Sequence, residues 1–209
     1  MRSEAIIKYV EGPRVLDVGC TDHIVKIGKP EWLHGRLRDH FEDVTGIDIS
    51  EENLNLMKEY GIPNLYLQSA EDFHFDEPFD TIVAGELIEH LSNPGMFLET
   101  AMKHLKSDGH IVLSTPYVFS LLYFLYAFLK FPKTCQNCEH TGWFCIQTMK
   151  ELVSRYNLKI VEFEMVEDYD PNDPSGTYRM FVRLIRLFRI VIPRRLRQNA
   201  MIFVLAKSN

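Results

Sequence analysis

The chain has 209 residues, of which 46% are hydrophobic and 25% are charged, and this ordinary globular composition excludes a disordered, collagen-like or coiled-coil protein. Its length suits a single domain, residues 1–209, with one sizeable core. The net charge of −6 argues against a nucleic-acid partner, because a general nucleic-acid binder needs a basic surface to neutralise phosphates.

Taken in chain order, the predicted elements alternate between strand and helix. Strands are predicted where β-branched and apolar residues concentrate, at residues 14–18, 44–49, 64–68, 81–84, 111–114, 159–166 and 200–206. Helices are predicted where apolar residues recur at helical spacing, from Pro30 to Phe41, Ser50 to Tyr60, Asn93 to Leu105 and Met149 to Tyr156. Strands separated by helices predict an α/β fold with a doubly wound, mostly parallel sheet.

The residues that follow the strands are the candidates for a ligand site. In a doubly wound sheet the ligand binds outside the carboxyl ends of the strands. Asp48 ends the second predicted strand, where a carboxylate can accept hydrogen bonds from both hydroxyls of a ribose. Asp48 therefore predicts a cofactor that contains a nucleoside.

Five segments together carry a family resemblance. They are VLDVGC (15–20), GIDIS (46–50), QSAEDFHF (68–75), FDTIVAGELIEHLSNPGMFL (79–98) and LKSDGHIVLSTP (105–116). In order and in spacing they resemble the class I S-adenosylmethionine-dependent methyltransferases. The resemblance implies a Rossmann-like methyltransferase fold, with seven strands, an antiparallel strand at the C-terminus and S-adenosylmethionine as the cofactor.

The resemblance also implies the residues that bind this cofactor. They are Asp17, Gly19, Cys20, Asp48, Ile49, Ala70, Glu71, Gly85 and Glu86. The backbone of Gly19 and Cys20 would border the methionine part, and Asp48 would hold the ribose. Ala70 and Glu71 would flank the adenine, while Gly85 and Glu86 would close the methionine end. The first loop keeps only Gly19 of the family's Gly-x-Gly-x-Gly, so it also lacks the Gly-x-Gly-x-x-Gly of a nicotinamide dehydrogenase.

Two histidines are the catalytic candidates, His90 and His140. The stretch Glu86-x-x-Glu89-His90 resembles the quinone O-methyltransferase branch, where the histidine lies at the mouth of the acceptor pocket. His90 could act as a general base or as a metal ligand, or it could simply orient the following loop. His140 belongs to the set Cys135, Cys138, His140 and Cys145, which holds four plausible zinc ligands, although the single residue between Cys138 and His140 is a tighter spacing than zinc sites usually have. We favour reduced thiols over zinc there and assign no metal to the chain. The resemblance implies instead that His140, with Trp143 and Phe144, could belong to the acceptor pocket.

Two insertions carry the features that the cofactor site does not explain. Residues 117–147 begin with an apolar, aromatic run and occupy the position of the family's acceptor lid. Residues 167–199 carry an amphipathic segment with Arg179, Arg183, Arg186 and Arg189 on one helical face. From Ser175 to Asn209 the chain holds eight basic residues and no acidic one, so this part carries +8 and the other 174 residues carry −14.

Each insertion allows more than one interpretation. Segments 117–131 and 178–197 suit peripheral contact with a membrane. The first could instead pack on the core or on a second subunit, and the arginines could bind an anionic acceptor or simply face solvent. The apolar run is too short to span a bilayer, and the N-terminus lacks the features of a secretory signal. We expect a cytoplasmic protein, with membrane-peripheral association as the alternative.

The predicted function is methyl transfer from S-adenosylmethionine to an oxygen or nitrogen of a small-molecule acceptor. A lipid-linked or glycan scaffold would suit the apolar and basic insertions. The alternative is a non-catalytic protein that keeps the methyltransferase fold and docks on a membrane or a partner. Neither the acceptor nor the oligomeric state follows from the sequence.

Overall fold

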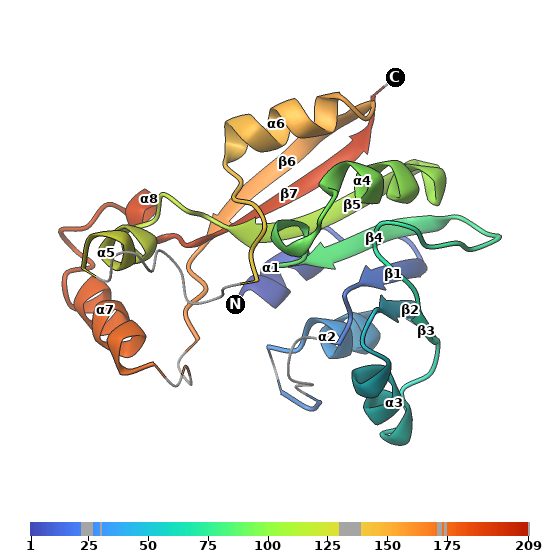
Figure 1. The fold of residues 1–209 in the computed structure, drawn as a ribbon, viewed down its shortest axis with the longest axis horizontal. Helices are drawn as coiled ribbons and strands as arrows, with labels where there is room; N and C mark the ends of the chain where they lie inside the picture. The colour runs from blue at the N-terminus through green and yellow to red at the C-terminus, as the bar shows by residue number, and fades with distance from the viewer. Residues whose placement is uncertain (22–26, 30, 130–138, 171–172, 174, 209) are drawn as a thin grey trace.

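The computed structural model describes residues 1–21, 27–29, 31–129, 139–170, 173 and 175–208 (Figure 1). The strands are β1 (Arg14–Val18), β2 (Asp43–Asp48), β3 (Leu65–Leu67), β4 (Phe79–Gly85), β5 (Leu105–Pro116), β6 (Leu158–Val166) and β7 (Ala200–Lys207). The helices are α1 (Arg2–Ile7), α2 (Leu33–His40), α3 (Glu51–Glu59), η1 (Ile88–His90, a 3₁₀ helix), α4 (Pro94–Lys103), α5 (Leu121–Leu129), α6 (Ile146–Ser154), α7 (Gly176–Leu187) and α8 (Arg194–Arg197).

The strands form one seven-stranded sheet in the order β3-β2-β1-β4-β5-β7-β6. The pairs from β3 to β5 are parallel, and β7 runs antiparallel to both β5 and β6. This confirms the predicted doubly wound, mostly parallel sheet with an antiparallel C-terminal strand. The strand order reverses between β1 and β4, so the ligand crevice is expected at their carboxyl ends.

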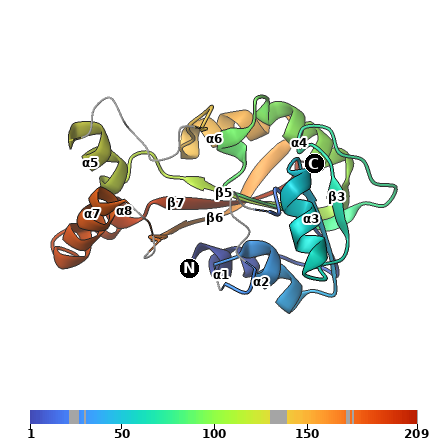
Figure 2. The same cartoon turned by 60° about the horizontal axis from the view of Figure 1, so that its bottom comes forward.

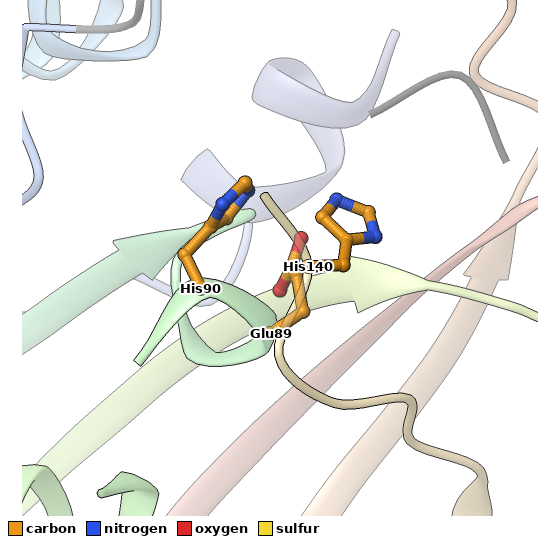
Figure 3. A group of neighbouring side chains, drawn as sticks. All are labelled: Glu89, His90 and His140. Atoms are coloured by element: carbon orange, nitrogen blue, oxygen red, sulfur yellow. The ribbon is translucent and has the colours of Figure 1, made fainter. Parts of the chain in front are cut away.

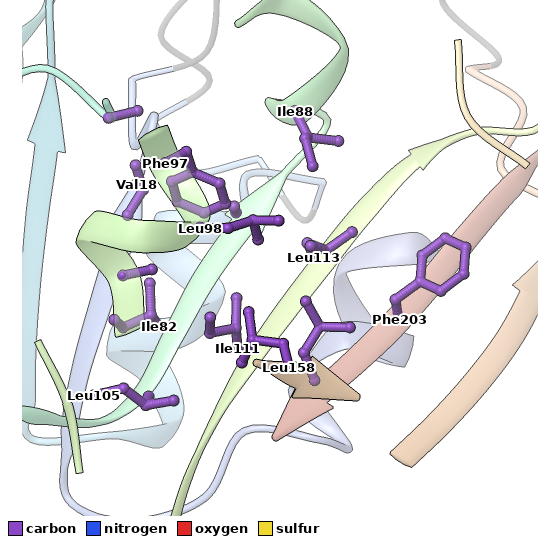
Figure 4. Close-up of a cluster of buried hydrophobic side chains, with 14 of the residues drawn as sticks. Val18, Ile82, Ile88, Phe97, Leu98, Leu105, Ile111, Leu113, Leu158 and Phe203 are labelled. Atoms are coloured by element: carbon purple, nitrogen blue, oxygen red, sulfur yellow. The ribbon is translucent and has the colours of Figure 1, made fainter. Parts of the chain in front are cut away.

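Helices cover both faces of the sheet and bury its two apolar surfaces. Figure 2 shows α4 and α6 on one face and α1 and α2 on the other. Phe97 of α4 and Met149 of α6 are fully buried in the larger core cluster, part of which is drawn in Figure 4. Ile6 of α1 and Leu37 of α2 belong to the cluster on the opposite face. The sheet therefore holds its strand ends on a rigid, two-sided core.

The structure corrects several predicted boundaries. Leu105 was expected on the apolar face of a helix, but α4 ends at Lys103 and Leu105 pairs with Phe79 at the start of β5. Asn64 was expected in a strand, but its φ of +57° is left-handed, so β3 begins one residue later. Pro30, the predicted start of a helix, lies outside the described residues, and α2 begins at Leu33. The short helix α1 had no counterpart among the predicted elements.

Helices α5, α7 and α8 of the two insertions form a small helical unit at one end of the sheet. In Figures 1 and 2, α5, α7 and α8 lie together beyond the sheet and away from the other helices. We call this unit the arm and define it as residues 121–129 and 175–197. The predicted arginine stripe is partly wrong, because α7 ends at Leu187 and Arg189 lies beyond it. Among the described residues, no helix combines the length and the apolarity needed to cross a membrane.

Candidate active site

A cleft of about 270 Å³ opens at the carboxyl ends of the strands, at the predicted switch point. It is lined by Gly19, Ile47, Asp48, Ile49, Gln68, Ser69, Ala70, Glu71, Leu87, His90, Leu91 and Ser92. Six of the predicted cofactor-binding and catalytic residues therefore meet in one cleft: Gly19, Asp48, Ile49, Ala70, Glu71 and His90. The other six lining residues stood in the quoted motifs but were not assigned to the site: Ile47, Gln68, Ser69, Leu87, Leu91 and Ser92.

Asp48 is held in place at the end of β2 by three short hydrogen bonds. The backbone N–H and the hydroxyl of Thr21 donate to Oδ2 at 3.1 and 2.9 Å, and the Ser50 N–H donates to Oδ1 at 2.9 Å. These bonds fix the carboxylate between the first loop and the start of α3. Each carboxylate oxygen can accept about two hydrogen bonds, so Asp48 can still accept hydrogen bonds from the hydroxyls of a ribose.

Gly19 lies at the end of β1, where the chain turns into the cleft. Its φ is +77°, and a Cβ atom there would come within 3.0 Å of the Leu87 side chain. Only glycine adopts this conformation without strain and leaves the space open. This open cradle beside Asp48 fits a nucleoside cofactor whose far end reaches the first loop.

Two predicted residues of the first loop point away from the cleft. Asp17 is 2% exposed and accepts a 3.0 Å hydrogen bond from Nδ1 of His34, a fully buried residue of α2. The Cys20 side chain is buried beside Trp32 and Leu54, and burial raises the pKa of its thiol. Only the backbone of Cys20, whose N–H donates to Ile47, remains near the cofactor loop. His34 had no sequence signal, since 17 residues separate it from Asp17.

The turn after β3 lines one end of the cleft, where adenine was expected. Ala70 is 8% exposed there, whereas Ile49 is 77% exposed at the rim. Glu71 is already engaged, because its side chain accepts a 2.7 Å hydrogen bond from the Asn93 N–H and its backbone carbonyl accepts one from Thr100. Glu71 thus connects this turn to the start of α4.

Gly85 ends β4 and Glu86 follows it, and neither is among the residues that line the cleft. A Cβ at Gly85 would collide with Leu33 at 2.6 Å. Glu86 is a non-glycine residue with a φ of +52°, held by hydrogen bonds from its N–H to Ser114. Its carboxylate forms a 3.1 Å ion pair with Arg2 of α1. Burial raises the pKa of Glu86, and the charge of Arg2 opposes that shift.

Glu89 is fully buried in η1, directly before the half-buried His90. Neither of its carboxyl oxygens has a hydrogen-bond partner among the residues that the structure describes. Burial, and then the charge of Glu86, raise the pKa of Glu89 well above its ordinary range. The protonated, neutral form is therefore favoured in this site.

His90 and His140 lie together although 50 positions separate them (Figure 3). Their rings are 4.7 Å apart and meet edge to face at 88°. His140 also packs on Trp143 at 4.9 Å, and Trp143 packs on Tyr123 of α5 at 5.3 Å. A continuous row of four rings, which we call the ring row, thus leads from the cleft at His90 to α5.

Thr141 holds this arrangement in place. Its hydroxyl donates to the carbonyl oxygens of Leu91 at 2.7 Å and Glu89 at 3.1 Å, and its N–H donates to Glu89 at 2.8 Å. The segment before α6 is therefore bound directly to η1. Because His90 and His140 flank these bonded residues, the backbone sets their separation.

Glu89, His90 and His140 each offer a ligand atom, and these atoms lie within 4.8 Å of one another. The trio has the chemistry of a divalent-metal site of mixed nitrogen and oxygen ligands. Of the four residues weighed as zinc ligands in the sequence, Cys135 and Cys138 lie outside the described residues. Cys145 caps α6 instead, with its N–H donating to the Thr148 hydroxyl at 2.9 Å.

The fold and the cleft define a doubly wound α/β domain with a cradle for a nucleoside-containing cofactor. The chain belongs to the methyltransferase-domain family, whose model matches residues 5–163. The predicted family is thereby confirmed.

Individual relatives agree with this assignment. A ubiquinone biosynthesis O-methyltransferase of Proteus mirabilis is 28% identical over 116 residues, which cover 50% of this chain and 42% of that relative. A Haloferax volcanii methyltransferase solved in complex with the Trm112 activator has a TM-score of 0.68 at 17% identity, over 100% of this chain and 89% of that one. A SAM-dependent methyltransferase from Archaeoglobus fulgidus has a TM-score of 0.66 at 19% identity, over 99% and 91%.

The matched region thus spans less than half the length of that curated relative. The structural neighbours share the fold at low sequence identity. Together with the family match they confirm the predicted Rossmann-like fold, the enzyme class and S-adenosylmethionine as the cofactor of that class.

Proposed function

We propose that this chain transfers the methyl group of S-adenosylmethionine to a hydroxyl oxygen of a small acceptor with an apolar, ring-bearing scaffold. The main support for this proposal is the ring row, which joins the cleft at His90 to α5. The printed name of the Proteus mirabilis relative, an O-methyltransferase of ubiquinone biosynthesis, supports oxygen over nitrogen and a quinone-like ring over a glycan.

The proposed cofactor contacts follow the cleft. Asp48 holds the ribose, Gly19 and the Cys20 backbone leave room for the methionine part, and Ala70 with Ile49 encloses the adenine. Gly85 and Glu86 shape the methionine end from behind, with Asp17 bracing the loop through His34. The bound cofactor supplies an already activated methyl group, so the protein mainly has to align the acceptor.

His90 is the proposed general base. It lines the cleft, and a hydroxyl acceptor must lose its proton as the methyl group is transferred. His140 packs edge-on against His90 and orients it, with the backbone clamp at Thr141 fixing the pair. Trp143 and Tyr123 would stack against the acceptor's ring or its apolar extension. Residues 117–147 then serve as the acceptor lid of a single methyltransferase domain.

The test compares three acceptors with the same purified full chain: a catechol, a catechol that carries an alkyl tail, and an aniline of similar size. We expect S-adenosylhomocysteine to form from S-adenosylmethionine with both catechols, faster with the alkyl tail, and not with the aniline. Methylation of the aniline alone would contradict an oxygen acceptor. An absence of heat on titration with S-adenosylmethionine would favour the alternative, a non-catalytic docking protein.

A further inference from the structure

The arm has a small core of its own. Tyr178, Phe181, Val182 and Ile185 of α7 are buried against Leu122 and Tyr126 of α5. None of these residues belongs to the clusters on either face of the sheet. The arm therefore stands as a separately packed unit on the end of β5, as Figure 2 shows.

The opposite side of α7 and the turn after it expose a continuous set of apolar side chains. Leu187 is 74% exposed, Ile190 97% and Val191 79%. Met180 and Leu184 are exposed on the same helix. Large aliphatic side chains exposed side by side mark an interaction surface rather than ordinary solvent contact.

Arginines surround this apolar set. Arg183, Arg189 and Arg195 are exposed, and within the described part of the chain no hydrogen bond or ion pair of their guanidinium groups is found. From Ser175 onward the sequence has no acidic residue. A partner that covers this face must therefore accept apolar side chains and supply negative charge at their rim.

The charge distribution selects the partner. A second copy docked through the same face would place arginines against arginines, which opposes association. A bilayer with anionic lipids supplies both requirements, an apolar interior and negative headgroups. The remaining 174 residues carry −14, so repulsion from the same headgroups would leave only the arm at the surface.

The arm also connects to the acceptor path. Phe181 of α7 packs edge-on against Tyr126 of α5 at 5.2 Å. One turn earlier on α5, Tyr123 is the last ring of the ring row. The same short helix therefore contacts the exposed surface unit and the route to the cleft.

We propose that the outer face of α7 and the turn after it, residues 180–195, dock the protein on an anionic bilayer. Leu187, Ile190 and Val191 insert between the lipids, and Arg183, Arg189 and Arg195 bind the headgroups. This inference rests on the proposed function, in which α5 receives an apolar acceptor. It adds that the acceptor comes from the membrane.

The experiment measures flotation of the full chain with vesicles of phosphatidylcholine alone and of phosphatidylcholine mixed with phosphatidylglycerol. We expect binding to the mixed vesicles, weakened by added salt. R183Q/R189Q/R195Q should weaken that binding by about 100-fold. I190S/V191S, which changes two exposed side chains, should weaken it by about tenfold or more.

The matched control is R38Q/K58Q/K150Q, which removes the same charge from exposed positions on α2, α3 and α6. It should float like the wild type. Equal binding by the R183Q/R189Q/R195Q variant and the wild type would overturn the proposal. So would a dimer in lipid-free light scattering that I190S/V191S breaks, with no vesicle binding.

The two proposals fail separately. Methylation of a soluble catechol without vesicle binding would refute the docking surface and leave the proposed function standing. Vesicle binding without cofactor binding would refute the function and leave the surface.

Discussion

Glu89 and His90 are neighbours in the sequence with opposite environments. Glu89 is fully buried, whereas His90 faces the cleft. Burial raises the pKa of the Glu89 carboxyl, which favours its protonated form, whereas the His90 imidazole lines the cleft, where an acceptor hydroxyl can reach it. This difference favours His90 over Glu89 as the group that accepts the acceptor's proton.

His90→Gln tests that role directly. The amide keeps a polar side chain at the cleft but cannot accept the hydroxyl proton, so kcat for a catechol should fall by about 100-fold. Titration with S-adenosylhomocysteine should give an unchanged affinity. His74→Gln, which alters an exposed histidine before β4, is the control. A fall in kcat no larger than that of the control would remove His90 from the chemistry.

The raised pKa of Glu89 predicts how the free energy of unfolding changes with pH. Its raised pKa means that the folded state keeps a proton that the unfolded state releases above about pH 4.3. The free energy of unfolding therefore falls as the pH rises from there towards the raised pKa, by at most about 1.4 kcal/mol per pH unit. Glu89→Gln has no proton to release and escapes this loss.

Urea unfolding with a chelator present, at about pH 5 and about pH 7, checks this. The free energy of unfolding of Glu89→Gln, relative to wild type, should be higher at the upper pH. Glu59→Gln, which removes an exposed carboxyl at the end of α3, should show no such rise. If the two variants behave alike, Glu89 is not held protonated.

At this scale the sequence predicted the residues that follow strands and missed those that meet across the fold. Asp48 and Gly19 could be placed because strand ends share one edge of a parallel sheet. His34 against Asp17 and Arg2 against Glu86 depend on where α2 and α1 dock. No local pattern records that docking.

At the scale of elements, the proposed acceptor side of the cleft depends on residues 139–144, just before α6. Residues 139–144 have no regular secondary structure, yet the hydrogen bonds of Thr141 fix them to η1. His140 was predicted as a catalytic candidate by resemblance, while the position of its ring in the ring row depends on this clamp. Trp143 is the ring that joins the clamped segment to α5.

Trp143→Ala should raise KM for the alkyl catechol by about tenfold, because the ring row loses its link between His140 and Tyr123 together with two edge-to-face contacts. Affinity for S-adenosylhomocysteine should stay the same, since Trp143 does not line the cofactor cleft. Phe119→Ala removes an aromatic ring that is 63% exposed in the same insertion and serves as the control. A loss of affinity for S-adenosylhomocysteine that accompanies the rise in KM would mean that Trp143 supports the whole cleft.

Strands and helices were predicted correctly where the spacing of apolar residues reflects burial, on both sides of a strand or on one face of a helix. They failed where the backbone changes conformation for other reasons. Leu105 continued a helical spacing but is buried in β5, and Asn64 left the strand through a left-handed φ. Ends of elements depend on such local events, so their positions were less predictable than their existence.

At the scale of the molecule, the sheet was predictable from the alternation of strand and helix, but the arm was not. Its two longer helices, α5 and α7, come from different insertions and are separated by 46 residues, between Leu129 and Gly176. In the sequence the first segment looked apolar and the second amphipathic, and only the fold shows that they bury side chains against each other. The uneven charge of the sequence thereby becomes a spatial separation of a basic arm from an acidic sheet domain.

Cofactor binding should be visible in the stability of the whole chain, because the cleft joins the ends of β1, β2 and β3 to η1. A ligand that binds only the folded state at about 100 times its Kd adds about 2.7 kcal/mol to the free energy of unfolding. For a chain of this size, S-adenosylhomocysteine should then raise Tm by about 5–10 °C.

Two variants at opposite ends of β2 separate specific binding from general stabilisation. Asp48→Asn weakens the carboxylate's hydrogen bonds to the ribose, each worth about 1.5–3 kcal/mol, so its Tm should rise much less at the same ligand concentration. Asp43→Asn makes the same chemical change at the amino end of the strand, far from the cleft, and should respond like the wild type. Each rise is measured against the same variant without ligand, so the loss of the Asp48 bonds to Thr21 and Ser50 does not enter the comparison. Equal rises for both variants would place the ribose elsewhere than at Asp48.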